Sequence, residues 1–406
     1  MSERRPGPAA LALAVTFLVA LGFLAWWLTR PAFVPPPPKI SFSPSGFGAL
    51  KGWADDDQAA ALAAFLISCR RFGRWADAHR VGPPELGLSA ADWKPACAAA
   101  PAVPAGDTAA ARAFFEAAFT PLTVAWGGET QGLFTGYYEP LLRGSRRRDD
   151  RFRVALHRRP DDLVRVELGR FDPALQGKRI AGRVVGAELE PYPDRAAIEA
   201  GALRDELALV WVDDPIDAFF LHIQGSGRVR LEDGGELRLR YADQNGRRYH
   251  AIGRELIRRG ALSRETVSMQ SIRAWLQAHP EEAAAVMGTN PSYVFFQELR
   301  GPGPLGALGV PLTPGRSIAV DRRLLPLGAP LWLEASHPDA DAGRPDRPLN
   351  RLMLAQDTGG AITGAVRGDV FWGHGDEAYE IAGRMKHPGR WYLLLPKAAA
   401  ARLAGG

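Results

Sequence analysis

The sequence has 406 residues, of which 46% are hydrophobic and 23% charged, and its formal net charge is +5. This is the composition of an ordinary globular protein, and the length exceeds one typical hydrophobic core, which predicts two domains. The positive charge is small and dispersed, and aromatic residues are not interleaved with base-reading side chains, so nucleic-acid binding is not supported.

The N-terminal region predicts a membrane anchor. Residues 9–28 form a stretch without a charge that is about as long as the roughly 20 apolar residues that span a bilayer. Arg4 and Arg5 precede it, so the positive-inside rule keeps the N-terminus cytoplasmic and exports the rest of the chain. No clear small-x-small cleavage site follows, which favours a retained signal anchor, although a cleaved signal peptide stays open as the alternative. The prolines at 35–38 predict a stiff spacer before the folded body.

The chain has only two cysteines, Cys69 and Cys97. Outside the cytoplasm two thiols are expected to be oxidised together, so one structural disulfide is predicted. The eight histidines lack the spacing of a metal-ligand set. No metal and no cofactor are therefore predicted.

The body begins with helical patterns and continues with strands. Acidic residues before apolar positions at helical spacing predict helices over residues 55–72 and 109–119. Short apolar segments between glycines then predict strands over residues 122–126, 133–138, 179–185, 207–212, 218–223, 229–231 and 237–241. Helices over 253–259 and 266–279 follow, and strands resume over 293–298, 317–320, 331–334, 349–356, 361–366 and 391–395. Many short strands of irregular spacing favour barrels, so the predicted fold is mostly β with two barrel-like domains and peripheral helices.

Three aspartates stand beside strand-forming segments in the C-terminal part of the chain: Asp321, Asp357 and Asp369. A single aspartate at a strand end is most simply a turn cap, but three weaken that explanation. Asp369 precedes the apolar residues 370–372, which would exclude water and raise its pKa, so that it stays protonated near neutral pH. Asp369 is therefore the candidate general acid.

Glycoside cleavage normally uses two carboxylates. When the C6 hydroxyl of the sugar itself attacks C1, one is enough, because the aspartate that protonated the leaving oxygen can then take the hydroxyl proton. Asp357 and Asp321 would then orient and polarise the groups around the reaction. Phe371 and Trp372 are candidates for stacking on sugar faces, although core packing is the more common fate of such residues.

Two motifs with glycines are candidate binding elements. Residues 136–140 place Tyr137, Tyr138 and Glu139 at a strand end, where they suit sugar hydroxyls, although a plain turn explains them equally well. The second motif spans residues 222–227, where small residues let a ligand approach the backbone and polar groups offer hydrogen bonds. Its candidate binding residues are Gln224, Gly225, Ser226 and Gly227. A phosphate loop is disfavoured because the lysine of a Walker motif is missing.

These segments occur in the order found in the MltA-type membrane-bound lytic transglycosylases, which the chain resembles over roughly residues 45–396. The resemblance is carried by residues 136–140, 218–227, 290–296, 356–364 and 368–373. The catalytic domain of this family has a three-aspartate ("3D") signature. Several motifs in one order make the resemblance specific.

The resemblance implies a double-ψ β-barrel built from residues 39–140 and 289–397. A second β-barrel domain, residues 141–288, would be inserted between these segments and form the other wall of a glycan groove. Residues 1–38 would hold a cytoplasmic tip, the anchor and the proline-rich linker, and residues 398–406 a C-terminal tail.

The resemblance also implies an activity, which is cleavage of the β-1,4 bond between N-acetylmuramic acid and N-acetylglucosamine in peptidoglycan to leave a 1,6-anhydromuramoyl end. Asp369 occupies the position of the sole catalytic acid and base, and Asp357 and Asp321 match its companions. The implied partners are glycan strands and, through the anchor, the membrane. Cell-wall synthesis and division proteins are candidates for further partners, and a monomer is expected.

One feature departs from the family pattern. Many relatives are lipoproteins with a cysteine at the mature N-terminus, whereas no cysteine precedes Cys69 here. This favours attachment by residues 9–28 at the periplasmic face of the inner membrane, or secretion into the periplasm if the segment is cleaved. Two other functions stay open: a muramidase that uses Asp357 as its second carboxylate, and a non-catalytic peptidoglycan-binding scaffold, against which the presence of all three acids argues.

Overall fold

The structure, a computed structural model, describes residues 38–301 and 303–404. The predicted anchor over residues 9–28 and nearly all of the proline spacer lie outside the described residues. Within the described part of the chain, no helix combines the length and the apolar character that a bilayer crossing requires.

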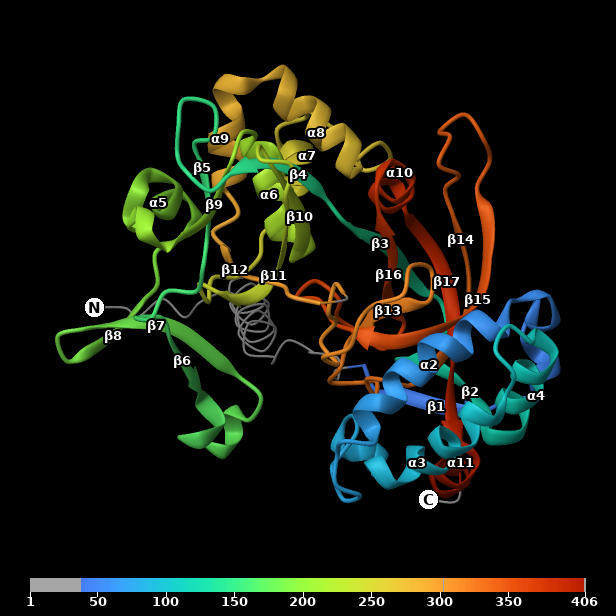
Figure 1. Ribbon diagram of the computed structural model, residues 1–406. Helices are drawn as coiled ribbons and strands as arrows, with labels where there is room; N and C mark the ends of the chain where they lie inside the picture. The colour runs from blue at the N-terminus through green and yellow to red at the C-terminus, as the bar shows by residue number, and fades with distance from the viewer. Residues whose placement is uncertain (1–37, 302, 405–406) are drawn as a thin grey trace, which may run out of the picture. The chain divides into compact units, whose positions relative to one another are not determined.

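The largest sheet joins the two ends of the described chain and closes into a barrel (Figure 1). Its strand order is β1 (Ile40–Pro44), β2 (Phe119–Trp126), β17 (Lys386–Pro396), β14 (Pro330–His337), β15 (Arg347–Asp357), β13 (Ser317–Val320), β16 (Arg367–His374) and β3 (Gly132–Glu139). Strand β3 also pairs with β17, so the strands from β17 to β3 form a closed ring of six. The pairs β13–β15 and β16–β3 are parallel. This ring confirms the predicted barrel made from the N-terminal and C-terminal segments.

Helices cover the outside of this barrel. They are α2 (Gln58–Phe72), α3 (Ala90–Ala99), α4 (Thr108–Ala118), α10 (Asp376–Arg384) and the C-terminal α11 (Lys397–Ala404). Phe72 of α2 stacks on Trp93 of α3 with ring centroids 5.1 Å apart, and both rings are buried in the core that the helices share with the barrel. Cys69 and Cys97 form the predicted disulfide, which joins α2 to α3. The predicted helices over residues 55–72 and 109–119 are confirmed as α2 and α4.

The chain between β3 and β13 forms a second sheet of six strands. Its order is β12 (Val294–Glu298), β11 (Glu236–Gln244), β10 (Ser226–Leu231), β4 (Leu141–Ser145), β9 (Ala208–Val212) and β5 (Val154–His157). An isolated bridge between Arg158 and Phe296 links the two ends of this order, as an inserted barrel requires. The sheet extends to Glu298 in β12, past the predicted domain boundary at residue 288.

Four helices pack together beside the second sheet: α6 (Pro215–Gln224), α7 (Ile252–Arg258), α8 (Met269–Ala278) and α9 (Pro280–Gly288). Their shared apolar cluster contains Phe220, Leu256, Leu276 and Val286. Helices α7 and α8 confirm the predictions over residues 253–259 and 266–279. Helix α9, which was not predicted, begins at Pro280, because proline is well accommodated in the first turn of a helix.

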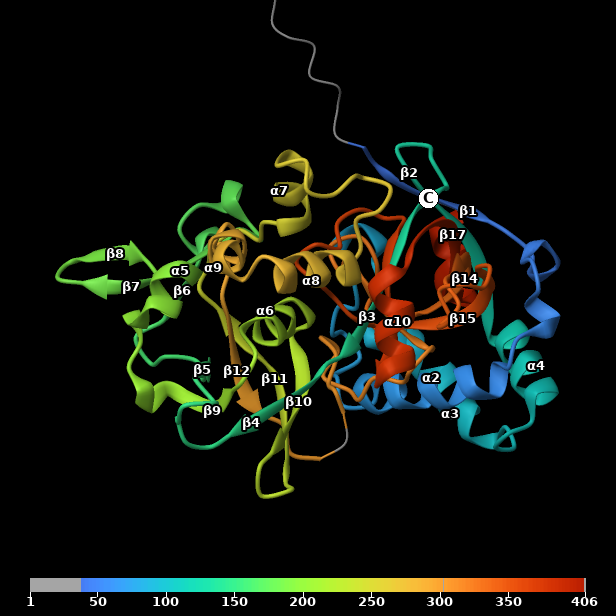
Figure 2. The same ribbon diagram turned by 90° about the horizontal axis from the view of Figure 1, so that it is seen from above.

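The inserted region also carries a separate three-stranded sheet. It consists of β6 (Val164–Glu167), β7 (Arg179–Val185) and β8 (Glu188–Pro191) in sequence order, all antiparallel. The β7–β8 hairpin projects from the rest of the inserted region (Figure 2).

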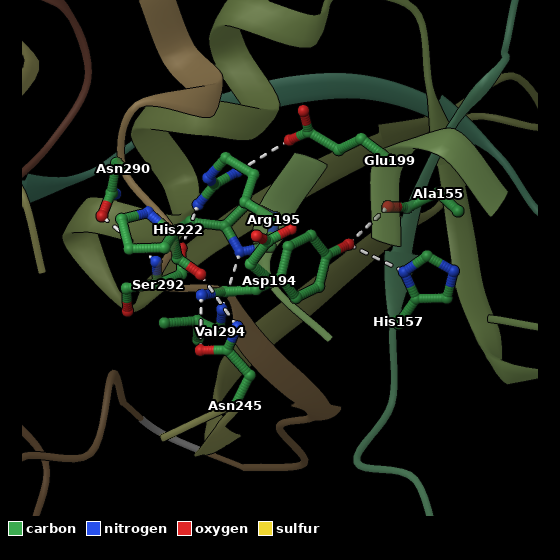
Figure 3. A network of polar contacts seen from close by, with 12 residues as sticks. Ala155, His157, Asp194, Arg195, Glu199, His222, Asn245, Asn290, Ser292 and Val294 are labelled. Carbon is green, nitrogen blue, oxygen red and sulfur yellow. Dashed lines mark hydrogen bonds and ion pairs between the residues drawn. The ribbon is translucent and has the colours of Figure 1, made fainter. Parts of the chain in front are cut away.

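Buried polar groups hold the segment that leads from α9 into β12 (Figure 3). The short helix α5 (Arg195–Ala197) supplies Arg195, whose guanidinium donates to the carbonyl oxygen of Ser292 at 2.9 Å and to Glu199 at 2.8 Å. The Asn245 amide donates to the carbonyl oxygens of Pro193 and Pro291, both at 2.9 Å. These bonds satisfy the backbone where no strand partner does so.

Residues 218–223 are helical, so the predicted strand over this segment is wrong. Helix α6 follows Asp214, whose Oδ1 accepts a hydrogen bond from the Ile216 N–H at 2.7 Å, and it ends at Gly225 with φ of 78°. Residues 218–222 are all buried. A run that is buried on all sides has no amphipathic periodicity, and its sequence pattern resembles that of a buried strand.

The predicted strand over residues 361–366 is also wrong. These residues belong to the loop between β15 and β16, where Gly364 has φ of 109°. The Gly364 N–H donates to Oδ2 of Asp321 at 3.0 Å instead of joining a strand ladder. A positive φ breaks the extended backbone, so strand β16 begins only at Arg367.

Candidate active site

Two of the three predicted acids lie beside the same barrel residue. Ala319 of β13 pairs with Asp357 of β15 on one side and with Asp369 of β16 on the other. Asp369 in turn pairs with Thr135 of β3. Directly paired residues of neighbouring strands point to the same face of a sheet. The two carboxyl groups and the Thr135 hydroxyl therefore gather over the small side chain of Ala319.

A bulge in β15 sets the direction of Asp357. The register between β13 and β15 shifts just before Ala319, and Gln356 is the extra residue. The buried Gln356 amide donates to the Ala64 carbonyl oxygen at 2.9 Å and accepts from the Ser317 hydroxyl at 2.6 Å. Bulges often re-aim a side chain next to an active site. This bulge turns Gln356 into the core and leaves Asp357 on the side of Asp369.

Asp369 is held through one of its two carboxyl oxygens. Its Oδ1 accepts a hydrogen bond from the Thr135 hydroxyl, and Thr135 Oγ1 accepts one from the Arg367 guanidinium at 2.9 Å. Among the described residues no donor contacts Oδ2, and the side chain is partly exposed. Burial raises the pKa of Asp369, and the Arg367 charge and the Thr135 bond offset this only in part. Asp369 therefore keeps its proton to a higher pH than an ordinary aspartate.

The apolar surroundings of Asp369 differ from the expected ones in one respect. Phe371 belongs to a buried cluster with Tyr137 and Ala319, directly beside the acids. Trp372 follows on the other side of β16 and packs against His337, with ring centroids 4.8 Å apart. Both rings are used in packing, and Phe371 has almost no exposed surface, so sugar stacking by these two residues stays a prediction.

Asp357 is held through both of its oxygens. Oδ2 accepts from the Tyr137 hydroxyl at 2.7 Å, and Oδ1 accepts from the backbone N–H groups of Ala307 at 2.9 Å and Thr358 at 2.8 Å. Burial raises the pKa of Asp357 against these bonds, and the charge of Asp369 adds to the rise. Burial and the charge of Asp357 raise the pKa of Tyr137 well above its ordinary value, so its phenol stays neutral and can donate.

Asp321 is engaged by a different set of groups. It accepts from the Arg323 guanidinium at 2.7 and 2.9 Å and from the Gly364 N–H at 3.0 Å. Burial acts to raise the pKa of Asp321, but the Arg323 and N–H hydrogen bonds outweigh it and the pKa is lowered. Asp321 therefore stays ionised and ties the β15–β16 loop to the end of β13. With Trp126 it also lines a pocket of about 440 Å³.

Tyr138 and Glu139 are buried at the end of β3. Tyr138 packs edge-on against Tyr379 of α10, with ring centroids 5.6 Å apart. Glu139 is paired with Arg228 of β10 at 3.3 Å, and burial raises the pKa of Glu139 while Arg228 opposes the rise. Both side chains face protein groups, so their contact with a substrate stays a prediction.

The predicted binding segment over residues 224–227 lies where α6 passes into β10. Gln224 Oε1 accepts from the Tyr138 N–H at 3.1 Å, which joins this segment to β3. Gly225 and Ser226 are partly exposed, whereas Gly227 is buried. A Cβ at Gly227 would lie 2.9 Å from the Pro140 carbonyl oxygen, so glycine permits a close backbone approach there. Of this segment, only the first three residues can be reached from solvent.

Thr135 and Arg367 were not among the predicted site residues. Thr135, on the neighbouring strand β3, donates its hydroxyl hydrogen to Asp369. Arg367, on the same strand as Asp369, donates to the Thr135 hydroxyl oxygen. Arg367 was within reach of sequence reasoning, because residues two apart in a strand share a face and Arg367 precedes Asp369 by two. Thr135 was not, because its position beside Asp369 depends on the pairing of β3 with β16.

Known proteins resemble this chain in sequence. A family model described as the MltA specific insert domain matches residues 133–297, and one described as the 3D domain matches residues 316–395. Membrane-bound lytic murein transglycosylase A of Escherichia coli (strain K12) is 35% identical over 275 residues, which are 67% of this chain and 68% of the relative. The protein of the same name from Vibrio cholerae is 33% identical over 273 residues, 66% of this chain and 67% of the relative.

Solved structures also resemble this chain. A membrane-bound lytic murein transglycosylase from Agrobacterium tumefaciens superimposes with a TM-score of 0.80 at 36% identity, covering 89% of this chain and 99% of that chain. MltA from Neisseria gonorrhoeae gives 0.71 at 36% identity, covering 90% and 95%. E. coli MltA with bound chitohexaose gives 0.62 at 28% identity, covering 89% and 95%.

Proposed function

This chain belongs to the MltA family of lytic murein transglycosylases, and from that premise we propose that Asp369 alone serves as the acid and then as the base of the reaction. The enzyme is a lytic transglycosylase of peptidoglycan. The single observation that carries the assignment is the contrast between the two neighbouring acids: within the described chain only one oxygen of Asp369 accepts a hydrogen bond, whereas both oxygens of Asp357 accept one or more.

The proposed reaction has two steps. Protonated Oδ2 of Asp369 first gives its proton to the oxygen that bridges N-acetylmuramic acid and N-acetylglucosamine, and the bond from that oxygen to C1 of the muramic residue breaks. The C6 hydroxyl of the same muramic residue then bonds to C1, and the Asp369 carboxylate takes the hydroxyl proton. The products are a free hydroxyl on N-acetylglucosamine and a 1,6-anhydro ring. No water is consumed, and Asp369 regains its proton.

Thr135 and Arg367 act as positioning residues in this scheme. Because Arg367 donates to Thr135 Oγ1, the hydroxyl hydrogen of Thr135 is directed at Asp369 Oδ1. A carboxyl oxygen that accepts such a bond is a poor place for the acidic proton. The proton therefore resides on Oδ2, the oxygen that is open to the substrate.

Asp357 is poorly suited to the second carboxylate role of a muramidase. That role requires an oxygen free to activate water or to attack the sugar. Tyr137, Ala307 and Thr358 already donate to the Asp357 oxygens. We assign Asp357 to maintaining the arrangement of Tyr137 beside Asp369, and Asp321 to holding the β15–β16 loop.

The proposed substrate and location follow from the relatives and the sequence. A bound chitohexaose in the E. coli MltA structure supports glycan strands as the ligand here, with Gln224, Gly225 and Ser226 as candidate contacts. Because the relatives are named membrane-bound, we place this enzyme at a membrane, anchored by residues 9–28 on the periplasmic face. We place the boundaries of the inserted domain at about residues 140 and 298, where the second sheet begins and ends.

The test is digestion of purified murein by the detergent-solubilised full chain, with the fragments weighed by mass spectrometry. The wild-type enzyme should release muropeptides with anhydro ends, which are lighter by one water than hydrolysis products. Asp369→Asn should lower the rate by about 10²–10⁴-fold, because loss of general acid–base catalysis typically costs this much. Glycan binding should persist, because the amide has nearly the shape of the acid.

Other outcomes would refute this proposal. Reducing ends in place of anhydro ends would indicate a hydrolase that uses two carboxylates. An undiminished rate in Asp369→Asn would remove this residue from the chemistry and favour the scaffold hypothesis. Asp321→Asn is the matched control, because it removes one charge of the three-aspartate set away from the Asp369 hydrogen bonds.

A further inference from the structure

The small sheet of β6, β7 and β8 has its apolar face turned away from the protein. Val166 pairs with Ile180 and Val184 pairs with Leu189, so these aliphatic side chains share one face of the sheet. Val164 pairs with residue 182 and belongs to the same face. We call these five side chains the outer face of the arm.

The opposite face of the arm is charged and contacts the second sheet. Arg165 Nε lies 3.2 Å from Oδ2 of Asp243, a buried residue of β11. Ala181 lies against Gly246, where an added Cβ would approach the Ala181 Cβ to 2.8 Å. Arg165 pairs with Ala181 in the sheet, so both mark the side that faces the protein. The usual arrangement, with the apolar side inward, is reversed here.

The outer face is well exposed. Val184 is 63% exposed and Ile180 is 47% exposed, Val164 and Leu189 are each more than a third exposed, and Val166 is partly buried. The connection between β6 and β7 adds Phe171, which is 78% exposed and follows the exposed Arg170. The largest exposed apolar patch on a typical monomer covers about 300–600 Å² and is often functional.

The chain outside the described residues indicates what this face meets. The predicted anchor ends at Leu28, and residues 29–38 can span no more than about 35 Å when fully extended. The folded body is therefore held close to a lipid surface. An exposed aromatic residue beside cations, together with an aliphatic face, suits the boundary between headgroups and acyl chains. Arg170 and Lys178 supply the cations of the β6–β7 connection, which also carries the exposed acid Asp172 next to Phe171.

A second copy of the chain fits this face less well. About half of the surface of these five aliphatic side chains is exposed, which gives an exposed apolar area on the order of 300 Å². Stable interfaces bury roughly 800 Å² per partner. We propose that the outer face of the arm and Phe171 dock on the lipid surface that holds the anchor, as a second membrane contact. This inference uses the proposed anchorage but none of the catalytic chemistry.

Neighbouring valines provide a matched test. The full chain is reconstituted into vesicles that contain anionic lipids, with an environment-sensitive fluorophore on Val184→Cys or on Val185→Cys. Val185 is 44% exposed and points to the opposite face, and the two native cysteines are paired with each other. We expect a blue shift and quenching by nitroxide-labelled lipid at position 184, and neither effect at position 185.

A second variant tests the face as a whole. A label on Phe171→Cys should lose its quenching by lipid when Ile180→Glu and Val184→Glu are also present. Murein digestion in detergent and the melting temperature should not change, because these residues touch neither the barrel core nor the acids. Retained digestion also separates this inference from the proposed function, since either can fail alone.

Three results would overturn the proposal. Equal signals at positions 184 and 185 would mean that the arm does not lie on the lipid by this face. Shielding at 184 that depends on protein concentration and not on lipid would identify a second copy as the occupant. If the fluorophore at position 184 is shielded without lipid at every protein dilution, residues 1–37 are identified as the occupant.

Discussion

At the scale of single residues, one hydroxyl group engages one oxygen of Asp369, the proposed catalytic acid, and leaves the other for the proposed proton transfer. Thr135 donates to Asp369 Oδ1 and accepts from Arg367, so it can turn its hydrogen in only one direction. Asp357 is close by but has donors on both oxygens. The two aspartates therefore differ in their hydrogen bonds, although burial raises the pKa of each.

Substitution of Thr135 should change both the rate and its pH dependence. In the proposed mechanism Asp369 acts in its protonated form, so activity should fall as the pH rises through its raised pKa. The Thr135 bond lowers that pKa, so Thr135→Val should move the alkaline limb of the kcat/KM profile to higher pH. The rate at the optimum should drop by up to about 100-fold, because a misplaced catalytic group costs this much.

The conservative variant supplies the control for this prediction. Thr135→Ser retains the hydroxyl and should keep the wild-type profile. An alkaline limb that moves to lower pH in Thr135→Val, or an identical loss in both variants, would show that the hydroxyl does not act through Asp369. A purely structural defect would lower the rate without moving the limb.

At the scale of elements, turns and bulges position the site more than the regular strands do. The bulge at Gln356 aims Asp357, and the positive φ of Gly364 lets the β15–β16 loop reach Asp321. In the inserted region, the Asn245 side chain forms hydrogen bonds with the backbone of Pro193 in one segment and of Pro291 and Tyr293 in another. In each case a side-chain amide or a glycine N–H forms hydrogen bonds in place of those that regular strand pairing would supply.

Asn245→Ala should destabilise the inserted sheet without touching the acids. Its amide group donates to two partly buried carbonyl oxygens and accepts from the buried Tyr293 N–H at 3.0 Å. A buried group left without a partner costs about 1–3 kcal/mol, so we expect a total loss of about 2 kcal/mol or more. Urea unfolding of the full chain measures it. Asn350→Ala, at a half-buried position of β15, is the control; an equal loss in both would contradict the role of the Asn245 network.

At the scale of the whole molecule, the barrel depends on contacts between distant parts of the chain. Arg316, just before β13, donates to both oxygens of Asp56 at 2.7 and 2.9 Å. The same guanidinium donates to the carbonyl oxygens of Leu352 and Asp57. The N-terminal helices are thereby attached to the C-terminal strands across 260 sequence positions.

Arg316→Met should be among the most destabilising changes in the barrel. It leaves the buried Asp56 carboxylate without its cation, and breaking one side of a buried ion pair typically costs about 3–5 kcal/mol. The double variant Asp56→Leu with Arg316→Met should recover part of this loss, because it removes the uncompensated charge. Thermal and urea unfolding check the prediction. A double variant less stable than Arg316→Met would show that the charge on Asp56 is not the cause.

Much of the candidate site could be predicted from the sequence. The three aspartates, the paired cysteines and the strand segments around residues 133–138 and 317–320 were found from local patterns. Helix α6 was mistaken for a strand, because the five consecutive buried residues 218–222 show no clear helical period in the sequence. The arm was predicted only as one strand, β7, and its reversed face could not be seen without the pairing of β6 and β8.

The sequence by itself determined which acids are present, where most of the strand segments lie and which thiols can pair, and it predicted which segment enters a membrane. Only the tertiary structure decided which acid keeps an oxygen that no donor of the described residues contacts. Thr135 meets Asp369 across 234 sequence positions, and Tyr137 meets Asp357 across 220. Side-chain spacing along the chain is local, whereas the pKa and the orientation of a buried acid depend on neighbours that strand pairing supplies from far away.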